Sequence, residues 1–374
     1  MTATCAVILA ACILGVLYPY AIYPAVLTLL PKVPVEPRPA PRMRFSLLFC
    51  AFNESNALDV KIPNLEALRK VDPELQVLAY DDGSLDDTLT KLSERPDLVE
   101  VFQGSGRLGK AHGMKVLAGQ AVGDVLIFTD ANVTLREDAL ERLSSWFSDP
   151  EVGGVCGTLR YVNADDSSTA AVGGAYWRLE EKIKTLESRT GNVMGADGSI
   201  FAVRRELYPD FPDTVLDDLT VSMAAVFAGK RLLKVDDVVA HERLVTDRKD
   251  EFSRKARIAA RAYHTHRVMK PQLRTMSRID TFKYVSHKVI RWFGGLFVII
   301  GTVAAIGLAT TVAPFLGLAA LVAVAASTVI AAKVKSGPIA ALAEIVIALL
   351  ATLLGVLRAA RGRTYSTWAP AGSR

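Results

Sequence analysis

The chain has 374 residues, 51% of them hydrophobic, with a net charge of +5 and a mean hydropathy of +0.26. This length allows one large domain or two ordinary ones, and the apolar residues are concentrated at the two ends, as in membrane-spanning segments. The sequence has no basic stripe interleaved with aromatic residues, which excludes a typical nucleic-acid-binding protein. The four scattered cysteines exclude a disulfide framework or a zinc site.

The N-terminal segment, residues 3–30, is a long apolar run without a charged residue. Basic residues follow this run, whereas a cleaved signal peptide carries them before it, so we interpret the segment as a transmembrane helix. Positive charge on its carboxyl side predicts that the N-terminus lies outside the cell and that the chain continues in the cytoplasm. Residues 31–41 contain five prolines and are expected to form a stiff linker. We therefore place a transmembrane helix at 1–31 and a linker at 32–44.

Short apolar runs alternate with amphipathic stretches in the middle of the chain. The predicted strands cover residues 44–51, 75–80, 99–102, 125–129, 153–162 and 232–241. The predicted helices cover residues 55–69, 113–121, 139–147, 170–187, 219–227 and 251–269. This alternation predicts an α/β fold with a doubly wound, mostly parallel sheet, and two further short strands are expected around the turn at 195–198. Ligands of such sheets bind beyond the carboxyl ends of the strands, so we expect one functional edge in a cytoplasmic domain at 45–284.

The last third of the chain is apolar again. Residues 285–294 resemble an interfacial helix, because basic residues and Trp292 stand among apolar ones. Three spanning candidates follow, at 293–310, 312–332 and 339–357. The third contains Glu344, and three crossings would place the basic tail outside the cell although its arginines favour the cytoplasm, so whether all three cross stays open. We expect a multi-pass protein of the inner or plasma membrane, with its C-terminal membrane region at 285–374.

Asp130 and Asn132 directly follow the predicted strand at 125–129. Spaced i, i+2 on an extended segment, they offer two oxygen ligands on one side, which suits a hard divalent cation that also holds substrate phosphates. An N-capping aspartate and a turn asparagine are the alternative interpretation of the same residues. The neighbouring loops favour the ligand site, because acidic and glycine-rich sequences also follow strands at residues 81–88 and 104–110.

Taken in order, these loops resemble those of the membrane-bound family-2 glycosyltransferases, which include the cellulose, hyaluronan and poly-N-acetylglucosamine synthases. The matching segments, within residues 45–291, are Ala51-Phe52-Asn53-Glu54, Asp81-Asp82-Gly83-Ser84 with Asp86 and Thr88, Gly109-Lys110, Thr129-Asp130-Ala131-Asn132, Leu216-Asp217-Asp218-Leu219, Ala240-His241-Glu242 and Arg254-Lys255-Ala256-Arg257. The resemblance implies a GT-A fold. It also implies inverting transfer of a sugar from a nucleotide diphosphate sugar to a glycan or a lipid-linked acceptor, in the synthesis of an extracellular polysaccharide or a glycolipid.

The resemblance further implies a role for each segment. The residues expected to bind a UDP-sugar are Ala51, Asn53, Glu54, Asp81, Asp82, Lys110, Asp130, Arg254 and Arg257. In similar enzymes an aspartate after the second strand accepts a hydrogen bond from the uracil imide, and arginines grip the diphosphate. A Mg²⁺ or Mn²⁺ ion is expected at Asp130 and Asn132, where it neutralises the departing UDP. Asp218 stands at the position of the general base with Asp217 in support. The residues assigned to acceptor binding are Gly195, Asp197 and Glu242.

Three positions depart from the family pattern. Asn132 replaces an aspartate, so the nucleotide phosphates are expected to hold most of the metal; Lys115 replaces an asparagine, and Ile258 replaces the tryptophan that stacks on the acceptor sugar. The missing tryptophan favours a single addition over processive polymerisation. Three alternatives stay open: transfer to polyprenyl phosphate, whose charged oxygen needs no base; a non-catalytic membrane subunit; and, for Asp217 and Asp218, a helix-capping pair.

Overall fold

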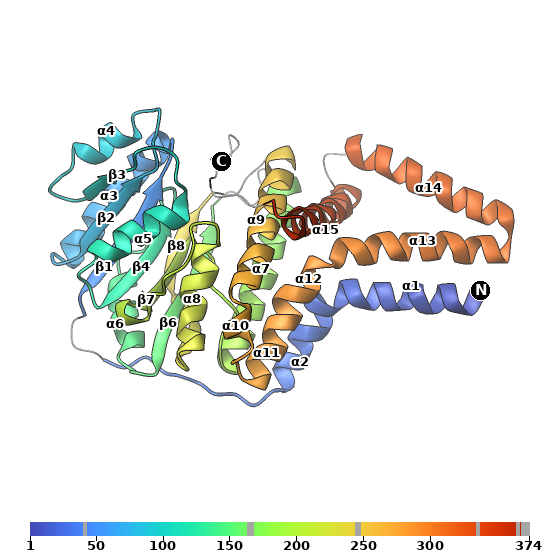
Figure 1. The fold of residues 1–374 in the computed structure, drawn as a ribbon, viewed down its shortest axis with the longest axis horizontal. Coiled ribbons are helices and arrows are strands. Elements are labelled where there is room, and N and C mark those ends of the chain that lie inside the picture. Colours follow the sequence, from blue (N-terminus) through green and yellow to red (C-terminus); the bar gives the residue numbers. More distant parts are fainter. Residues whose placement is uncertain (40–42, 163–167, 244–247, 334–336, 364–366, 368–374) are drawn as a thin grey trace.

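The computed structural model describes residues 1–39, 43–162, 168–243, 248–333, 337–363 and 367. One eight-stranded sheet with helices on both faces forms the larger body, and apolar helices extend from one side of it (Figure 1). The strands are β1 (Phe45–Ala51), β2 (Gln76–Asp81), β3 (Glu100–Gln103), β4 (Val125–Asp130), β5 (Thr134–Leu135), β6 (Val152–Tyr161), β7 (Ile200–Arg204) and β8 (Arg231–Glu242), in the spatial order β3-β2-β1-β4-β7-β6-β8-β5. The predicted α/β fold is confirmed.

The first half of the sheet is parallel, since β1 pairs with β2 and β4, and β2 pairs with β3. Every residue of β1 is buried, as expected of a strand covered on both faces, and its sequence is accordingly an apolar run. Phe49 belongs to the core shared with α3 (Ser55–Val71) and α6 (Ala139–Phe147). Leu48 belongs to the core shared with α5 (Lys110–Gln120) and α8 (Asp217–Phe227). Packing on both faces of the sheet therefore fixes the carboxyl end of β1. The remaining helix of this half, α4 (Thr88–Ser93), follows β2 in the chain.

The second half of the sheet is mixed. β7 runs antiparallel to both β4 and β6, whereas β6 and β8 are parallel to each other. The prediction of two short strands around 195–198 is wrong in part, because only β7 forms; between α7 (Ser168–Arg189) and β7, Gly191 and Gly195 adopt φ values of +136° and +98°, which interrupt an extended strand. An antiparallel β7 begins at the edge where β4 and β6 end. The segment 195–199 therefore joins the loops at the carboxyl edge of the sheet.

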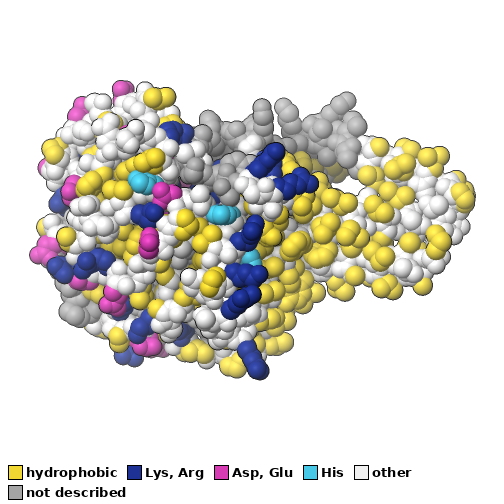
Figure 2. Space-filling view, in the orientation of Figure 1, with side chains coloured by type: hydrophobic (Ala, Val, Ile, Leu, Met, Phe, Trp, Pro, Cys, Tyr) yellow, Lys and Arg dark blue, Asp and Glu magenta, His cyan; other side chains and the backbone are white. Residues whose placement is uncertain are grey.

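The membrane-type helices lie to one side of the sheet. Their elements are α1 (Thr2–Leu17), η1 (Tyr18–Ile22) and α2 (Tyr23–Leu29) at the N-terminus, then α9 (Arg248–Val268), α10 (Lys270–Leu273), α11 (Arg278–Tyr284), η3 (Val285–Val289), α12 (Ile290–Trp292), α13 (Gly294–Val312), α14 (Pro314–Lys333) and α15 (Gly337–Ala360). Within the described part of the chain, the helices long and apolar enough to cross a membrane are Thr2–Leu29, Gly294–Val312 and Gly337–Ala360. Figure 2 shows the hydrophobic surface of the projecting helices and a band of Lys and Arg side chains where they meet the larger body.

The third apolar helix, α15, does not extend outward with the others. Figure 1 shows α1, α13 and α14 projecting from the body, whereas α15 turns back, and its contacts include α9 and α7. A Cβ placed on Gly355 would lie 2.2 Å from the carbonyl oxygen of Ala256, so α15 and α9 touch backbone to backbone. Ala351 and Ala359, one turn to either side of Gly355, are also buried. This packing against α9 sets α15 apart from the other spanning candidates.

Gly355→Leu is expected to lower stability, because the added side chain forces α15 away from the backbone of α9. Overpacking of this kind typically costs about 1–3 kcal/mol. Thermal unfolding of the full chain in detergent measures the effect, with Ala360→Leu as the control, since Ala360 is exposed on the same helix. Equal melting temperatures for the two variants would show that the contact contributes nothing.

Candidate active site

Asp81 and Asp82 lie at the end of β2 with no exposed surface. Asp82 Oδ1 accepts hydrogen bonds from the backbone N–H groups of Leu108 and Gly109 at 2.8 and 2.9 Å. Asp81 Oδ2 accepts hydrogen bonds from two N–H groups of the following turn, each at 3.2 Å, and Gly83 allows this turn with a φ of +77°. Asp81 Oδ1 and Asp82 Oδ2 have no hydrogen-bond partner among the described residues. Both oxygens are therefore acceptors that a ligand can satisfy.

The loop after β1 is tied to the loop after β2. Asn53, whose φ is +52°, donates its N–H to Ser84 Oγ at 3.0 Å, and its Oδ1 accepts from the N–H of Leu85 at 2.8 Å. The N–H of Glu54 donates to Thr88 Oγ1 at 2.8 Å. Asn53 and Glu54 thus fix the shape of the neighbouring loop, and their predicted contact with the nucleotide sugar remains a prediction.

Arg107 belongs to this side of the site, although the sequence did not single it out. Its guanidinium carbon lies 3.5 Å from the centroid of the Phe52 ring, and its Nε lies 3.7 Å from Asp82 Oδ2. The carbonyl of Ala51 accepts the N–H of Asp82 at 2.9 Å. The sequence did contain a signal for a role of Arg107 in ligand binding. Arg107 is a cation in the glycine-rich loop ahead of Lys110, and such loops contact phosphates and bases.

Lys110 connects this side to the end of β4. Its ammonium donates to Asp130 Oδ1 at 2.6 Å. A Cβ placed on Gly198 would lie 2.9 Å from Lys110 Nζ and 3.4 Å from Asp218 Oδ2, so these groups meet around one glycine. Lys110 is also the next residue after the N–H groups that bind Asp82. A continuous set of contacts therefore joins Asp82, Asp130 and Asp218 at one edge of the sheet.

The charges at this meeting point influence one another. The pKa of Asp218 is raised to about 6, first by burial and then by the adjacent carboxylate of Asp217, although Lys110 lowers it. Burial lowers the pKa of Lys110, but the carboxylates of Asp130, Asp217 and Asp218 outweigh burial and hold that pKa above its ordinary value. Lys110 is therefore charged at neutral pH, whereas Asp218 is a carboxylate that exchanges its proton close to neutrality.

Asp217→Asn is expected to move the acid limb of the pH–rate profile to lower pH. The neighbouring negative charge raises the pKa of Asp218, so its removal lowers that pKa and the base loses its proton earlier in a titration from acid. The measurement is kcat/KM for sugar transfer against pH, with Asp210→Asn as the control because Asp210 is an exposed carboxylate in the preceding loop. A limb that stays in place or moves to higher pH contradicts this coupling.

Asn132 and Glu242 pack together beside Asp130. Asn132 Nδ2 donates to Glu242 Oε1 at 3.2 Å, and Ser199 Oγ donates to Glu242 Oε2 at 3.1 Å. Asn132 Oδ1 is buried and lacks a hydrogen-bond partner among the residues that the structure describes. Glu242 therefore orients the asparagine and the start of β7, and its predicted contact with an acceptor remains a prediction.

Asp130 and Asn132 fit a divalent cation in chemical type, because a carboxylate and an unpartnered amide oxygen are hard oxygen ligands. No group of three or more His, Cys, Asp or Glu side chains suited to a metal occurs in the described part of the chain. Most ligands would therefore come from substrate phosphates.

Lys61 stabilises the turn that follows β4. Its ammonium donates to the carbonyl of Asp130 at 3.1 Å and to the carbonyl of Val133 at 2.7 Å, and burial lowers its pKa to about 7.

The turn before β7 is held by its own contacts. Lys184 Nζ donates to Asp197 Oδ2 at 2.7 Å, and the N–H of Ser199 donates to Asp197 Oδ1 at 3.3 Å. A Cβ placed on Gly195 would lie 2.5 Å from Leu219 Cδ1, so this position admits only glycine without a shift. Asp197 thus stabilises the turn, and acceptor binding by Gly195 and Asp197 remains a prediction.

The basic helix α9 reaches the site through Arg261. Arg254 and Arg257 are partly exposed on α9, and their role at a diphosphate remains a prediction. Arg261 is only 3% exposed, its Nη2 donates to the carbonyl of Val215, and its charge contributes to lowering the pKa of Asp218. Arg261 follows Arg257 by four residues and therefore lies on the same face of α9. This spacing was the signal in the sequence that a third arginine of α9 faces the site.

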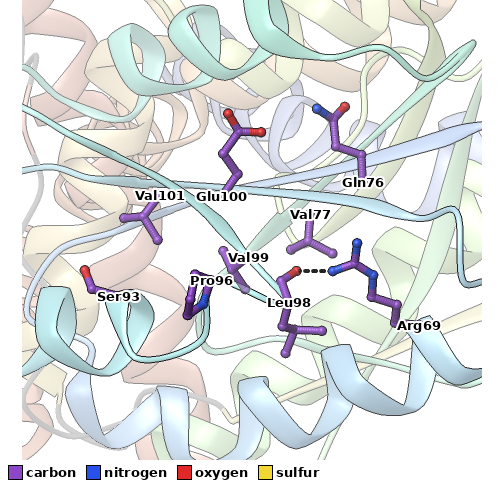
Figure 3. Close-up of a pocket in the computed structure, with 9 residues that line it drawn as sticks. All are labelled: Arg69, Gln76, Val77, Ser93, Pro96, Leu98, Val99, Glu100 and Val101. Atoms are coloured by element: carbon purple, nitrogen blue, oxygen red, sulfur yellow. Dashed lines mark hydrogen bonds between the residues drawn. The ribbon is translucent and has the colours of Figure 1, made fainter.

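A separate cavity of about 500 Å³ lies at the opposite edge of the sheet, where β2 and β3 begin. Figure 3 shows its lining between α3, α4 and the two strands, with an Arg69 N–H donating to the carbonyl of Leu98. Its lining residues are Arg69, Gln76, Val77, Ser93, Pro96, Leu98, Val99, Glu100 and Val101. None of these is a candidate site residue, so the cavity is separate from the carboxylates at the carboxyl edge.

Comparison with known proteins agrees with this geometry. The sequence model of glycosyl transferase family 2 matches residues 46–211, from the second residue of β1 through β7, with the loops of Asp82, Lys110 and Asp130. An N-acetylglucosaminyltransferase of Rhizobium meliloti (strain 1021) is 25% identical over 285 residues, or 72% of this chain and 66% of the relative. An N-acetylglucosaminyltransferase of Rhizobium leguminosarum bv. trifolii is 31% identical over 122 residues, or 31% of this chain and 67% of the relative.

A solved structure supports the fold over the whole chain. The mannosyltransferase PcManGT of Pyrobaculum calidifontis, in complex with GDP-mannose and Mn²⁺, superposes with a TM-score of 0.74 at 21% identity, covering 94% of this chain and 98% of that one. The chain spans about two thirds of the length of the Rhizobium meliloti relative. Together, the family match and the arrangement of the sheet edge show that this chain belongs to glycosyltransferase family 2, with a GT-A fold, and is a glycosyltransferase.

Proposed function

We propose that the protein transfers a sugar, N-acetylglucosamine in the first place, from a UDP-sugar to a hydroxyl group of a glycan or lipid-linked acceptor, with inversion at the anomeric carbon. The observation that carries the proposal is that Lys110 and Asp218 meet at Gly198 while Lys110 also donates to Asp130. The choice of sugar rests on the names of the relatives, which are N-acetylglucosaminyltransferases.

The nucleotide would bind at the end of β2. Asp81 Oδ1 and Asp82 Oδ2, which have no hydrogen-bond partner among the described residues, are acceptors for the imide N–H of uracil. The Arg107 guanidinium above Phe52 adds a cationic surface on the same side. The diphosphate would then lie over the start of α5, where Lys110 and the helix N-terminus favour negative charge.

Transfer itself needs one proton acceptor. The acceptor oxygen attacks C1 of the sugar, the bond from C1 to the diphosphate oxygen breaks, the electron pair leaves with UDP, and the hydroxyl proton moves to Asp218. A base with a pKa of about 6 is mostly ionised at pH 7 and is still able to take a proton. Lys110 faces the leaving group with a positive charge. A Mg²⁺ or Mn²⁺ ion held by Asp130 and Asn132 would add positive charge at the same diphosphate.

The apolar helices suggest where this reaction takes place. We place α1 and α13 across the inner or plasma membrane, with the sheet and its site on the cytoplasmic side, because basic residues follow α2. An acceptor that is anchored in, or leaves through, the bilayer would then meet the site at the band of basic side chains in Figure 2.

A donor panel tests the proposal. Purified full-length protein is incubated with UDP-N-acetylglucosamine, UDP-glucose, UDP-N-acetylgalactosamine and GDP-mannose, each with Mn²⁺, with Mg²⁺ or with a chelator, and released nucleotide is measured. The proposal expects UDP release from UDP-N-acetylglucosamine to exceed release from the other donors and to depend on the metal. Preferred use of GDP-mannose would overturn the uridine assignment at Asp81 and Asp82.

A further inference from the structure

We propose that Lys288 and Arg291 form a phosphate-binding subsite beside the acceptor turn, and that the acceptor is a saccharide joined to a membrane lipid through a phosphate. This inference rests on the proposed transfer to a hydroxyl group at Asp218. It adds the class of acceptor and the residues that hold its anionic end.

The first observation is the position of Lys288 relative to the base. A Cβ placed on Gly195 would lie 4.0 Å from Lys288 Cε, and one placed on Gly198 would lie 3.4 Å from Asp218 Oδ2. Gly195 and Gly198 are three residues apart, so this stretch of backbone spans at most about 10 Å. The ammonium of Lys288 and the carboxylate of Asp218 thus flank one short turn. A single saccharide unit is of a size to bridge them.

The second observation is an excess of positive charge. Glu180 accepts from His287 Nε2 at 2.7 Å and from Arg291 Nη1 at 2.5 Å, and it lies 4.0 Å from Lys288 Nζ. His287 Nδ1 lies 2.8 Å from Glu187 Oε1, so the second carboxylate of this group is already in contact with the imidazole. Arg291 and Lys288 therefore share one carboxylate, that of Glu180.

The third observation concerns unused donors. Lys288 makes no hydrogen bond to a described residue, and its nearest carboxylate oxygen is the one of Glu180 at 4.0 Å. Arg291 is 10% exposed, and its Nε and Nη2 have no hydrogen-bond partner among the described residues, while the rings of Tyr20 and Tyr176 lie 5.0 and 6.0 Å from its guanidinium carbon. A guanidinium and an ammonium with free N–H groups are the donors that bind phosphate.

The location favours a phosphate on a lipid over a free one. Arg291 lies in α12, directly before α13, and its neighbour Tyr20 belongs to the N-terminal apolar segment Thr2–Leu29. A phosphate held here would stand at the point where the chain enters the apolar helices. Burial lowers the pKa of Lys288, and a bound anion would offset this by stabilising the ammonium.

The test compares acceptors that differ only in the phosphate. Full-length protein in nanodiscs of neutral lipid receives the donor found in the panel and either a sugar linked to a short polyprenyl chain by diphosphate or the same sugar as a neutral alkyl glycoside. Lys288→Met is expected to raise the KM for the phosphate-linked acceptor at least tenfold. The same variant should leave the KM for the neutral glycoside and the acceptor-free hydrolysis of the donor unchanged. Lys270→Met, at an exposed lysine, removes the same charge as the control.

A binding measurement separates this inference from the proposed function. Binding of the phosphate-linked sugar to the same nanodiscs, without donor, is followed by native mass spectrometry for the wild type and Lys288→Met, with phosphatidylglycerol and inorganic diphosphate as competitors. At least tenfold weaker binding by the variant supports the subsite even if no donor is turned over, and competition by inorganic diphosphate supports recognition of the phosphate itself. Equal binding by both proteins, or phosphatidylglycerol binding as tightly as the phosphate-linked sugar, overturns the acceptor assignment.

Discussion

Asp218→Asn is expected to lower the rate of sugar transfer by about a thousandfold, since general-base catalysis contributes roughly 10²–10⁴ to such reactions. The amide keeps the size of the side chain and an oxygen that accepts the N–H of Leu219, which Asp218 Oδ1 accepts at 2.7 Å. It cannot take the proton of the acceptor hydroxyl. Binding of UDP involves the end of β2 and should stay within about twofold of the wild-type affinity, because no proton moves on binding.

Transfer to the hydroxyl acceptor and calorimetric binding of UDP are measured on the same preparation. An acceptor whose nucleophile is already an anion, such as a phosphate monoester, needs no base, so retained transfer to it by Asp218→Asn would identify a different acceptor chemistry. Retained transfer to a neutral hydroxyl acceptor would remove Asp218 from its role. Loss of UDP binding together with transfer would indicate a damaged site rather than a missing base.

Asp130→Ala is expected to lower transfer by on the order of a hundredfold or more, a loss typical of removing one electrostatic contact from a transition state. The substitution removes the partner that holds Lys110 Nζ at 2.6 Å and one of the two predicted metal ligands. Without it, Lys110 is free to turn toward Asp218 around Gly198. The affinity for UDP should then become nearly independent of Mn²⁺.

Calorimetry with UDP, with and without Mn²⁺, tests this directly. The matched control is Asp124→Ala, because Asp124 precedes the same strand at its other end and forms an exposed ion pair with Arg44 at 2.9 Å. Exposed pairs contribute little, so this control should retain both transfer and the metal effect. A metal effect that survives in Asp130→Ala contradicts the proposed ligand.

The parallel half of the fold was predictable from the sequence, because strands buried on both faces are continuous apolar runs. The predicted strand at 125–129 corresponds to β4, and the predicted helix at 139–147 has the same bounds as α6. A short strand after the turn at 195–198 was predicted, but its antiparallel direction was not, since the direction of a strand depends on its partners and not on its own residues. The packing of α15 against α9 could not be predicted from the sequence either, because an apolar helix with small residues is compatible with both lipid and protein neighbours.

In the candidate site, too, some features were predictable from the sequence and others were not. Asp82, Asp130 and Asp218 were predictable because each follows a strand or begins a helix at the edge that binds ligands. The partners of these residues were not, since contacts such as Lys184 with Asp197, or Asn132 with Glu242, join segments whose approach depends on the folded sheet. Arg107 was marked only by its place in the glycine-rich loop before Lys110, and Lys288 has no local pattern that separates it from ordinary surface cations.

The contact between Tyr23 and Glu187 bears on how this enzyme can be prepared. Tyr23 has no exposed surface, and its hydroxyl donates to Glu187 Oε1 at 2.6 Å, the same oxygen that faces His287. A fragment trimmed to the sheet domain at residues 45–284 would lose both Tyr23 and His287. The buried Glu187 Oε1 would then lack these two partners, while the N–H of Met194 still donates to Oε2. Purification trials should therefore keep the N-terminal helix and the segment up to α13, and solubilise the protein in detergent from the start.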